Sequence, residues 1–129
     1  MIVLDANVLI AWLDPGDSLH ERALTDLDEA AAEPLGAATL TLAEVLVGPA
    51  RAGRLQAAYA ALADLGVSEI ALDGEAVTLA TLRVETDRRL PDCCVLAAAQ
   101  LTHAGAILTF DRKLAAAARL LGLRLLDEP

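Results

Sequence analysis

Short apolar runs alternate with helical patterns along the whole 129-residue chain. The apolar runs are too short for helices and are typical of strands buried on both faces. Between them, apolar residues recur at three- and four-residue spacing and end at glycine or proline, which predicts helices. The predicted strands are 2–4, 37–40, 67–72, 106–109 and 123–126, and the predicted helices are 7–13, 18–32, 41–47, 51–65, 75–88, 92–103 and 111–121.

Strands that alternate with helices predict an α/β fold built on a parallel sheet, since each parallel crossover needs a long connection. The expected architecture is a three-layer α/β/α sandwich with a five-stranded parallel sheet. Gly48 and Pro49 are expected to interrupt the helical pattern between the second and third strands. Because no linker or internal repeat divides the sequence, residues 1–129 are predicted to form one domain.

Composition narrows the classes of function. Hydrophobic residues make up 56% of the chain, which excludes disorder, and a net charge of −9 argues against a nonspecific binder of polyanions. A nucleic-acid enzyme stays possible, because a metal-lined cleft can meet a phosphate through its cations. The apolar start of the chain carries Asp5 and lacks a basic region, so we expect neither a signal peptide nor a membrane span.

The two cysteines, Cys93 and Cys94, are adjacent in a predicted helix. Their side chains then point about 100° apart and are poorly placed to form a disulfide. Reduced, buried thiols are therefore expected, and these suit a cytoplasmic protein. His20 and His103 stand alone in the sequence and are interpreted as surface or boundary residues.

Four acidic residues stand beside apolar stretches. Asp5 directly follows the first strand, Asp111 lies two residues past the fourth, Asp92 begins a helix, and Glu44 lies on an apolar helix face. Taken singly, the three aspartates could be helix caps, and Glu44 could extend its carboxylate to water. Taken together, they predict an acidic pocket at the carboxyl edge of the sheet, where α/β folds place their sites.

Carboxylates packed together repel one another unless a cation is present. An all-oxygen set of ligands favours Mg²⁺, with Mn²⁺ possible, whereas Zn²⁺ would be expected to recruit histidine or cysteine. A metal pocket of this kind supports hydrolysis of phosphodiester bonds.

Four segments carry a resemblance to a known family: IVLDANVLI at 2–10, TLAEVLVG at 41–48, LPDCCVLAAA at 90–99 and AILTFDRKL at 106–114. In this order and spacing they resemble the PIN-domain ribonucleases, specifically VapC-type toxins of bacterial type II toxin–antitoxin systems. The sequence departs from the family's pattern at Cys93-Cys94 and at Leu114, where relatives often carry alanine and an aromatic residue. We expect both departures to affect packing more than chemistry.

The resemblance implies that Asp5, Glu44, Asp92 and Asp111 are catalytic residues that bind the metal. It further implies that Asn7 and Thr109 support them by hydrogen bonding, and that the first and fourth strands are neighbours. The implied protein is a cytoplasmic, Mg²⁺- or Mn²⁺-dependent endoribonuclease that forms a homodimer and is neutralised by a VapB-type antitoxin. Basic residues near the motifs are candidate contacts to RNA phosphates or, equally, ordinary surface charges: Arg88, Arg89, Arg112 and Lys113.

Two other functions fit part of the pattern. A phosphatase similar to the haloacid dehalogenases would use Asp5 as its nucleophile, but it needs a second aspartate two residues later, where this chain has Asn7. A non-catalytic PIN-like binding module would usually have lost one of the four carboxylates, and none is lost here.

Overall fold

A four-stranded parallel sheet forms the centre of the computed structural model, which describes residues 1–126. The strands are β1 (Ile2–Leu4), β2 (Leu35–Ala38), β3 (Val67–Ile70) and β4 (Ala106–Leu108), in the order β3-β2-β1-β4. The predicted α/β class and parallel pairing are confirmed, and β1 lies beside β4. Strand β2 begins two residues before its predicted start, and it ends two residues before its predicted end because residues 39 and 40 already belong to a helix.

The prediction of a fifth strand at 123–126 is wrong for the described residues. Leu125 forms only an isolated parallel bridge with Ile107. Two backbone hydrogen bonds hold it, from the Ile107 N–H to the Arg124 carbonyl and from the Leu126 N–H to the Ile107 carbonyl. The chain therefore touches the free edge of β4 at one point and does not extend along it.

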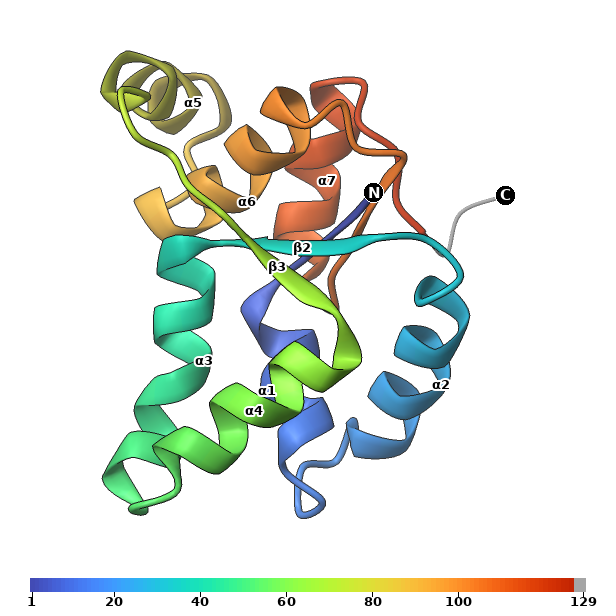
Figure 1. The fold of residues 1–129 in the computed structure, drawn as a ribbon. Coiled ribbons are helices and arrows are strands. Elements are labelled where there is room, and N and C mark those ends of the chain that lie inside the picture. Colours follow the sequence, from blue (N-terminus) through green and yellow to red (C-terminus); the bar gives the residue numbers. More distant parts are fainter. Residues whose placement is uncertain (127–129) are drawn as a thin grey trace.

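Helices cover both faces of the sheet and make three layers (Figure 1). Side chains of β1 alternate between the faces, since Val3 lies in one buried cluster and Ile2 and Leu4 lie in the other. The Val3 side is covered by α5 (Ala76–Thr86), α6 (Leu90–Leu101) and α7 (Arg112–Leu120). The other side is covered by α1 (Ala6–Leu13), α2 (His20–Ala30), α3 (Thr39–Arg51) and α4 (Leu55–Leu65).

Helix α3 is longer than predicted, because it continues through Gly48 and Pro49 to Arg51. A proline in the last turn removes one hydrogen-bond donor but leaves few turns after it to disrupt. The break comes instead at Gly53, whose φ of 71° is in the left-handed region. The Arg54 N–H then bonds to the Pro49 carbonyl at 2.8 Å, and α4 begins at Leu55.

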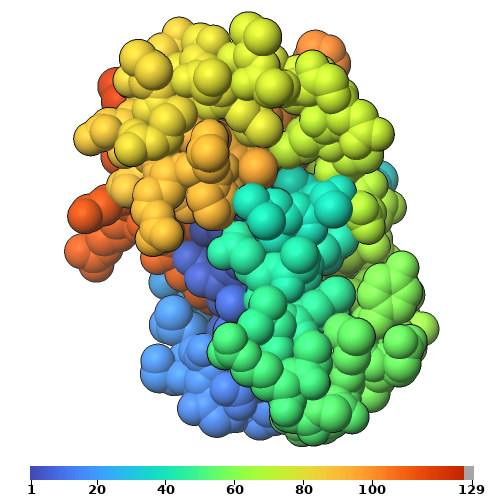
Figure 2. Space-filling model, turned by 90° about the vertical axis from the view of Figure 1, so that its left-hand side faces the viewer, coloured from blue at the N-terminus to red at the C-terminus, as the bar shows by residue number. Residues whose placement is uncertain are grey.

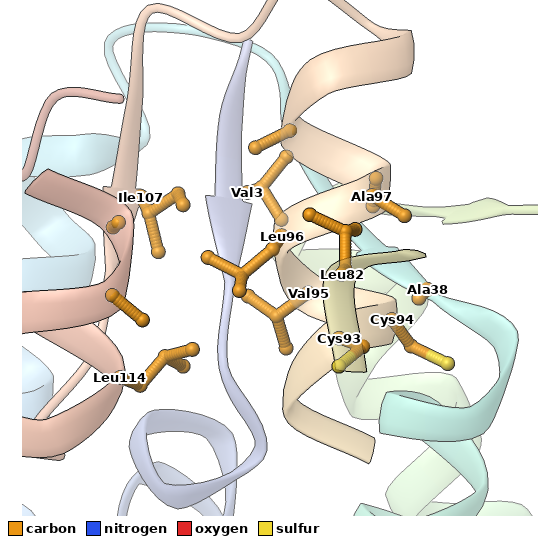
Figure 3. Packing of buried hydrophobic residues seen from close by; sticks show 14 of the residues in the cluster. Val3, Ala38, Leu82, Cys93, Cys94, Val95, Leu96, Ala97, Ile107 and Leu114 are labelled. Atoms are coloured by element: carbon orange, nitrogen blue, oxygen red, sulfur yellow. The ribbon is translucent and has the colours of Figure 1, made fainter. Parts of the chain in front are cut away.

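Helix α6 lies closest to the centre of the fold. All seven residues from Cys93 to Ala99 are buried, and most of them are small, which lets the helix approach β1 and β2 closely (Figure 3). Cys93 and Cys94 are free and buried, as predicted. Burial places α6 firmly, so the residues of its first turn have fixed positions at the edge of the sheet.

Among residues 1–126, no helix is both long enough and apolar enough to cross a lipid bilayer.

Replacing Leu114 tests the packing of α7 against the sheet. Leu114 is fully buried, whereas Leu120 of the same helix is 82% exposed. We expect Leu114→Ala to lower the free energy of unfolding by about 2–5 kcal/mol, because it leaves a cavity in the core. Leu120→Ala should change it by less than about 0.5 kcal/mol. Urea titration followed by circular dichroism measures both; equal losses would contradict the observed packing.

Candidate active site

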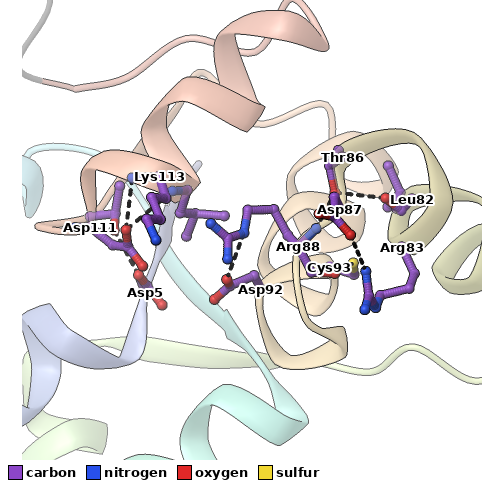
Figure 4. A network of polar contacts seen from close by, with 12 residues as sticks. Asp5, Leu82, Arg83, Thr86, Asp87, Arg88, Asp92, Cys93, Asp111 and Lys113 are labelled. Carbon is purple, nitrogen blue, oxygen red and sulfur yellow. Dashed lines mark hydrogen bonds and ion pairs between the residues drawn. The ribbon is translucent and has the colours of Figure 1, made fainter.

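The ends of β1 and β4 bring two of the predicted carboxylates together. Their register aligns Leu4 with Leu108, and the Asp5 N–H continues the ladder by bonding to the Leu108 carbonyl at 3.0 Å. Asp5 and Asp111 therefore leave the sheet at the same edge, as the adjacency of the two strands predicts (Figure 4).

Both aspartates also begin helices. Asp5 Oδ1 accepts a hydrogen bond from the Ala6 N–H at 2.8 Å and caps α1. Asp111 Oδ1 accepts from the N–H groups of Lys113 and Leu114 and caps α7. The interpretation of these residues as helix caps is thus correct, and it leaves open a second role for each carboxylate, because a cap uses only one of the two oxygens.

The Thr109 hydroxyl joins these two ends of the site. It donates to Asp5 Oδ2 at 2.6 Å and accepts from the Asp111 N–H at 3.0 Å. Asn7 bonds to the loop and not to a carboxylate: its Oδ1 accepts a hydrogen bond from the Phe110 N–H at 3.2 Å. Thr109 therefore orients the Asp5 carboxylate directly, and Asn7 fixes the loop that carries Thr109 and Asp111.

Asp92 approaches the same place from the first turn of α6. Its Oδ2 lies 3.4 Å from Arg88 Nε, and each side chain keeps only about a fifth of its surface exposed, 20% for Arg88 and 23% for Asp92. Arg88, a predicted contact for RNA, thus faces an acidic residue of the chain itself. Figure 4 shows Arg88 and Asp92 next to the Asp5 and Asp111 carboxylates.

Electrostatics ties the three aspartates together. Burial raises the pKa of Asp5, the bonds from Thr109 and Ala6 oppose this rise, and the charges of Asp92 and Asp111 add to it. Burial also raises the pKa of Asp92, with a contribution from Asp111 that Arg88 and Arg89 oppose. Asp5 is only 7% exposed. The site is consequently a place where negative charge is poorly solvated and a cation would be favoured.

Glu44 lies apart from these three residues, on α3. It is exposed and lines a cavity of about 420 Å³ between α1 and α3, and its charge also acts on Cys94 of α6. Figure 2 shows the start of α1, in dark blue, at the floor of a hollow between α3 and the orange and red segments of α6 and α7. Asp5, Asp92 and Asp111 are not among the residues that line the Glu44 cavity. The cavity is lined by Ile10, Leu13, Asp14, Pro15, Glu44, Val45, Gly48, Pro49 and Arg54.

Within residues 1–126, no three acidic, histidine or cysteine side chains converge closely enough to hold one metal ion in their present conformations. Each aspartate is instead engaged by a hydroxyl, a backbone N–H or Arg88. In chemical kind, the residues fit a hard divalent cation, since all the candidate donors are carboxylate oxygens around a buried, negatively charged position.

The basic candidates differ in exposure. Arg89, Arg112 and Lys113 are exposed at the starts of α6 and α7, beside the aspartates. Arg54 was missed as a candidate because the sequence places it inside a predicted helix; the structure places it in the cavity with Glu44. Arg22 was also missed: its guanidinium lies 4.7 Å from the centre of the Phe110 ring, beside the loop that carries Asp111.

A protein-family model of the PIN domain matches residues 2–120. The chain belongs to the PIN domain family. No curated protein sequence matches it significantly. Because the matched residues include all four carboxylates, the resemblance noted from the four segments is confirmed at the level of the family.

Several solved structures of PIN proteins are similar in fold. A chain of a toxin–antitoxin complex from Klebsiella pneumoniae is 28% identical, with a TM-score of 0.71 and coverage of 90% of this chain and 91% of that one. Mycobacterium tuberculosis VapC20, described as a toxin that cleaves the sarcin–ricin loop, is 20% identical with a TM-score of 0.67, covering 91% and 95%. Neisseria gonorrhoeae FitAcB is 22% identical with a TM-score of 0.73, covering 98% and 97%. The last two support the fold alone.

The raised pKa of Asp5 predicts a pH-dependent stability of the metal-free protein. Below the ordinary value of 3.8, both the folded and unfolded chains hold the proton. As pH rises above it, the unfolded chain releases this proton while the folded chain keeps it, so the free energy of unfolding falls. In EDTA, Asp5→Asn should therefore gain stability relative to the wild type as pH rises from about 4 to 7. Urea titrations at several pH values measure this gain, and a pH-independent difference between the two proteins would contradict it.

Proposed function

We propose that the protein is a metal-dependent endoribonuclease toxin of the VapC type, which hydrolyses phosphodiester bonds in RNA. One observation carries the proposal: in a PIN-domain chain, the buried Asp5 carboxylate is linked to the Asp111 backbone through Thr109 and feels the negative charges of both Asp92 and Asp111. A purely structural cap needs no such neighbours, and their mutual repulsion costs stability.

Mg²⁺, with Mn²⁺ as an alternative, is the proposed cofactor. When bound, such an ion lowers the pKa of a water molecule and stabilises charge on a leaving oxygen. Asp5, Asp92 and Asp111 would hold it, and Glu44 would approach from the α3 wall of the hollow. Thr109 orients Asp5 through their 2.6 Å hydrogen bond, and Asn7 keeps the 109–111 loop in place.

Basic residues around the hollow are proposed to bind the phosphates of RNA. Arg89, Arg112 and Lys113 are exposed beside the aspartates, and Arg54 lies with Glu44 in the cavity. Single-stranded or looped RNA suits this arrangement, because a phosphate of its exposed backbone can reach the proposed metal. A net charge of −9 leaves the rest of the surface unfavourable to RNA, which would direct binding to the hollow.

We further propose a cognate VapB-type antitoxin as the partner, a homodimer as the assembly and the cytoplasm as the location. Similar folds occur in a toxin–antitoxin complex from Klebsiella pneumoniae and in a VapBC2 complex from Rickettsia felis that is bound to promoter DNA. An arginine or lysine of the antitoxin, placed among the carboxylates, would neutralise the charge that a metal would otherwise neutralise.

The phosphatase alternative has little structural support. The Asn7 side chain stands where a second aspartate would act as acid and base, and its Oδ1 is bonded to the Phe110 N–H. A binding module without catalysis stays as the second candidate, because Asp5, Asp92 and Asp111 are all engaged by groups of the chain itself.

Cleavage of RNA by the purified protein tests the proposal. With Mg²⁺ or Mn²⁺ we expect cleavage of single-stranded or looped RNA, and its loss in EDTA. Asp5→Asn should reduce the rate by more than about a hundredfold, because it removes a proposed ligand charge. Gel electrophoresis of end-labelled RNA measures the rate.

Asp64→Asn is the matched control for this assay, since Asp64 is exposed on α4. It removes the same charge away from the site and should leave the rate unchanged. Cleavage that survives Asp5→Asn would contradict the nuclease. Phosphate release from a monoester, with phosphate trapped on Asp5, would support the phosphatase.

Association with a small, basic-tailed protein encoded by a neighbouring gene tests the toxin–antitoxin role. Because the proposed contact pairs basic residues with carboxylates, the dissociation constant should rise steeply with salt concentration. Asp92→Asn should weaken the complex by about 30-fold or more, as expected when one partner of a buried charge pair is removed at a cost of about 2–5 kcal/mol. Calorimetry at several salt concentrations measures this, and a complex indifferent to both changes would contradict the proposed contact.

A further inference from the structure

Arg88 points into the carboxylate site and not toward solvent. Its Nε lies 3.4 Å from Asp92 Oδ2, and only 20% of its side chain is exposed. Asp92 in turn feels the negative charge of Asp111, and Figure 4 shows the guanidinium paired with the Asp92 carboxylate. Arg88 thus forms an ion pair with one of the aspartates of the site, whereas the neighbouring Arg89 is exposed.

The backbone holds Arg88 in this position. Its N–H donates to Thr86 Oγ1 at 3.2 Å, and its carbonyl accepts from Cys93 Sγ at 3.4 Å. Thr86 is itself anchored, because its hydroxyl donates to the Leu82 carbonyl at 2.7 Å. The short connection between α5 and α6 is therefore hydrogen-bonded to both helices. These bonds fix the backbone of Arg88 at a position from which its side chain reaches Asp92.

The contact between Arg88 and Asp92 depends on charge and lacks a well-formed hydrogen bond. Arg88 Nε is buried and has no hydrogen-bond partner, even though it lies within ion-pair distance of Asp92. A buried N–H without an acceptor is unfavourable. Such a pairing is readily exchanged for a stronger cation at the same carboxylate, because a divalent ion brings twice the charge to the same oxygens.

We propose that Arg88 is an internal counter-ion of the carboxylate site, which competes with the divalent cation for Asp92. In the metal-free protein it offsets repulsion among the aspartates and turns Asp92 away from a shared centre. When the cation binds, Asp92 exchanges Arg88 for it. Arg88 therefore weakens metal binding and sets the metal concentration at which the site fills. This inference rests on the proposed metal site.

Metal binding by an Arg88 variant tests the inference without any assay of activity. In protein freed of metal by EDTA and dialysis, the dissociation constant for Mn²⁺ is measured by calorimetry. Arg88→Gln should bind Mn²⁺ about two- to fivefold more tightly than the wild type, the range of a partly exposed ion pair. Arg89→Gln is the matched control, because it removes the same charge one residue away without an ion pair, and it should shift the constant less.

Thermal unfolding provides a second readout on the same proteins. Without metal, Arg88→Gln should melt at a lower temperature than Arg89→Gln, since it leaves the aspartates without their counter-ion. Saturating Mn²⁺ should then raise its melting temperature by more than it raises that of the wild type. Arg88→Lys keeps the charge and should bind Mn²⁺ with an affinity between those of the wild type and Arg88→Gln.

Three results would overturn the inference. These are an unchanged or weaker Mn²⁺ affinity in Arg88→Gln, an equal gain in Arg89→Gln, and a tighter affinity in Arg88→Lys than in Arg88→Gln. If the wild type binds Mn²⁺ and loses it in Asp92→Asn, such results leave the proposed function standing. If the wild type binds no Mn²⁺ at all, the proposed metal site fails together with the inference.

Discussion

The parallel pairing of β1 with β4 is the constraint on which the rest of this structure depends. It aligns Leu4 with Leu108, so the chain emerges from both strands at one edge of the sheet. The Thr109 hydroxyl then links the two exits, because it bonds to both the Asp5 carboxylate and the Asp111 N–H. The same two aspartates cap α1 and α7. The strand pairing, the helix starts and the candidate site are consequently one arrangement, and a change to any of them affects the others.

That arrangement places negative charge where water is scarce. The chain offsets it with backbone N–H groups, the Thr109 hydroxyl and Arg88, and the raised pKa of Asp5 indicates that this compensation is incomplete. Strain of this kind persists only when the surrounding structure supplies the stability. Here the two buried clusters, one on each face of the sheet, supply it. The site is therefore preorganised at the expense of stability, which is typical of functional residues.

Much of the fold could be predicted from local patterns. Strands β1 and β4 are short apolar runs, and their parallel orientation follows from the helices between the strands, whereas their adjacency was implied only by the family resemblance. The start of β2 could not be predicted, because Gly36 weakens the pattern of a strand. The structure explains the glycine: an added Cβ would lie 2.8 Å from Ile70 Cδ1 and 2.9 Å from Met1 Sδ. At 123–126 the sequence shows the opposite mismatch: its pattern is that of a strand, but the described residues form only one bridge, between Leu125 and Ile107.

The site was predictable only as far as it follows from topology. Asp5 and Asp111 meet because strand ends meet, whereas the positions of Arg88 and Glu44 depend on how helices pack. Arg88 and Asp92 are four residues apart, a spacing that predicts a contact only within one helix. Because Arg88 lies before the start of α6, the sequence does not indicate that the two side chains form an ion pair. Glu44 lines the cavity between α1 and α3 together with Asp14 and Arg54, and none of the site's three aspartates is among the lining residues of that cavity. Among residues 1–126 these carboxylates do not form a group that could hold a metal ion, so convergence of all four would depend on the proposed cation and the phosphate of its substrate.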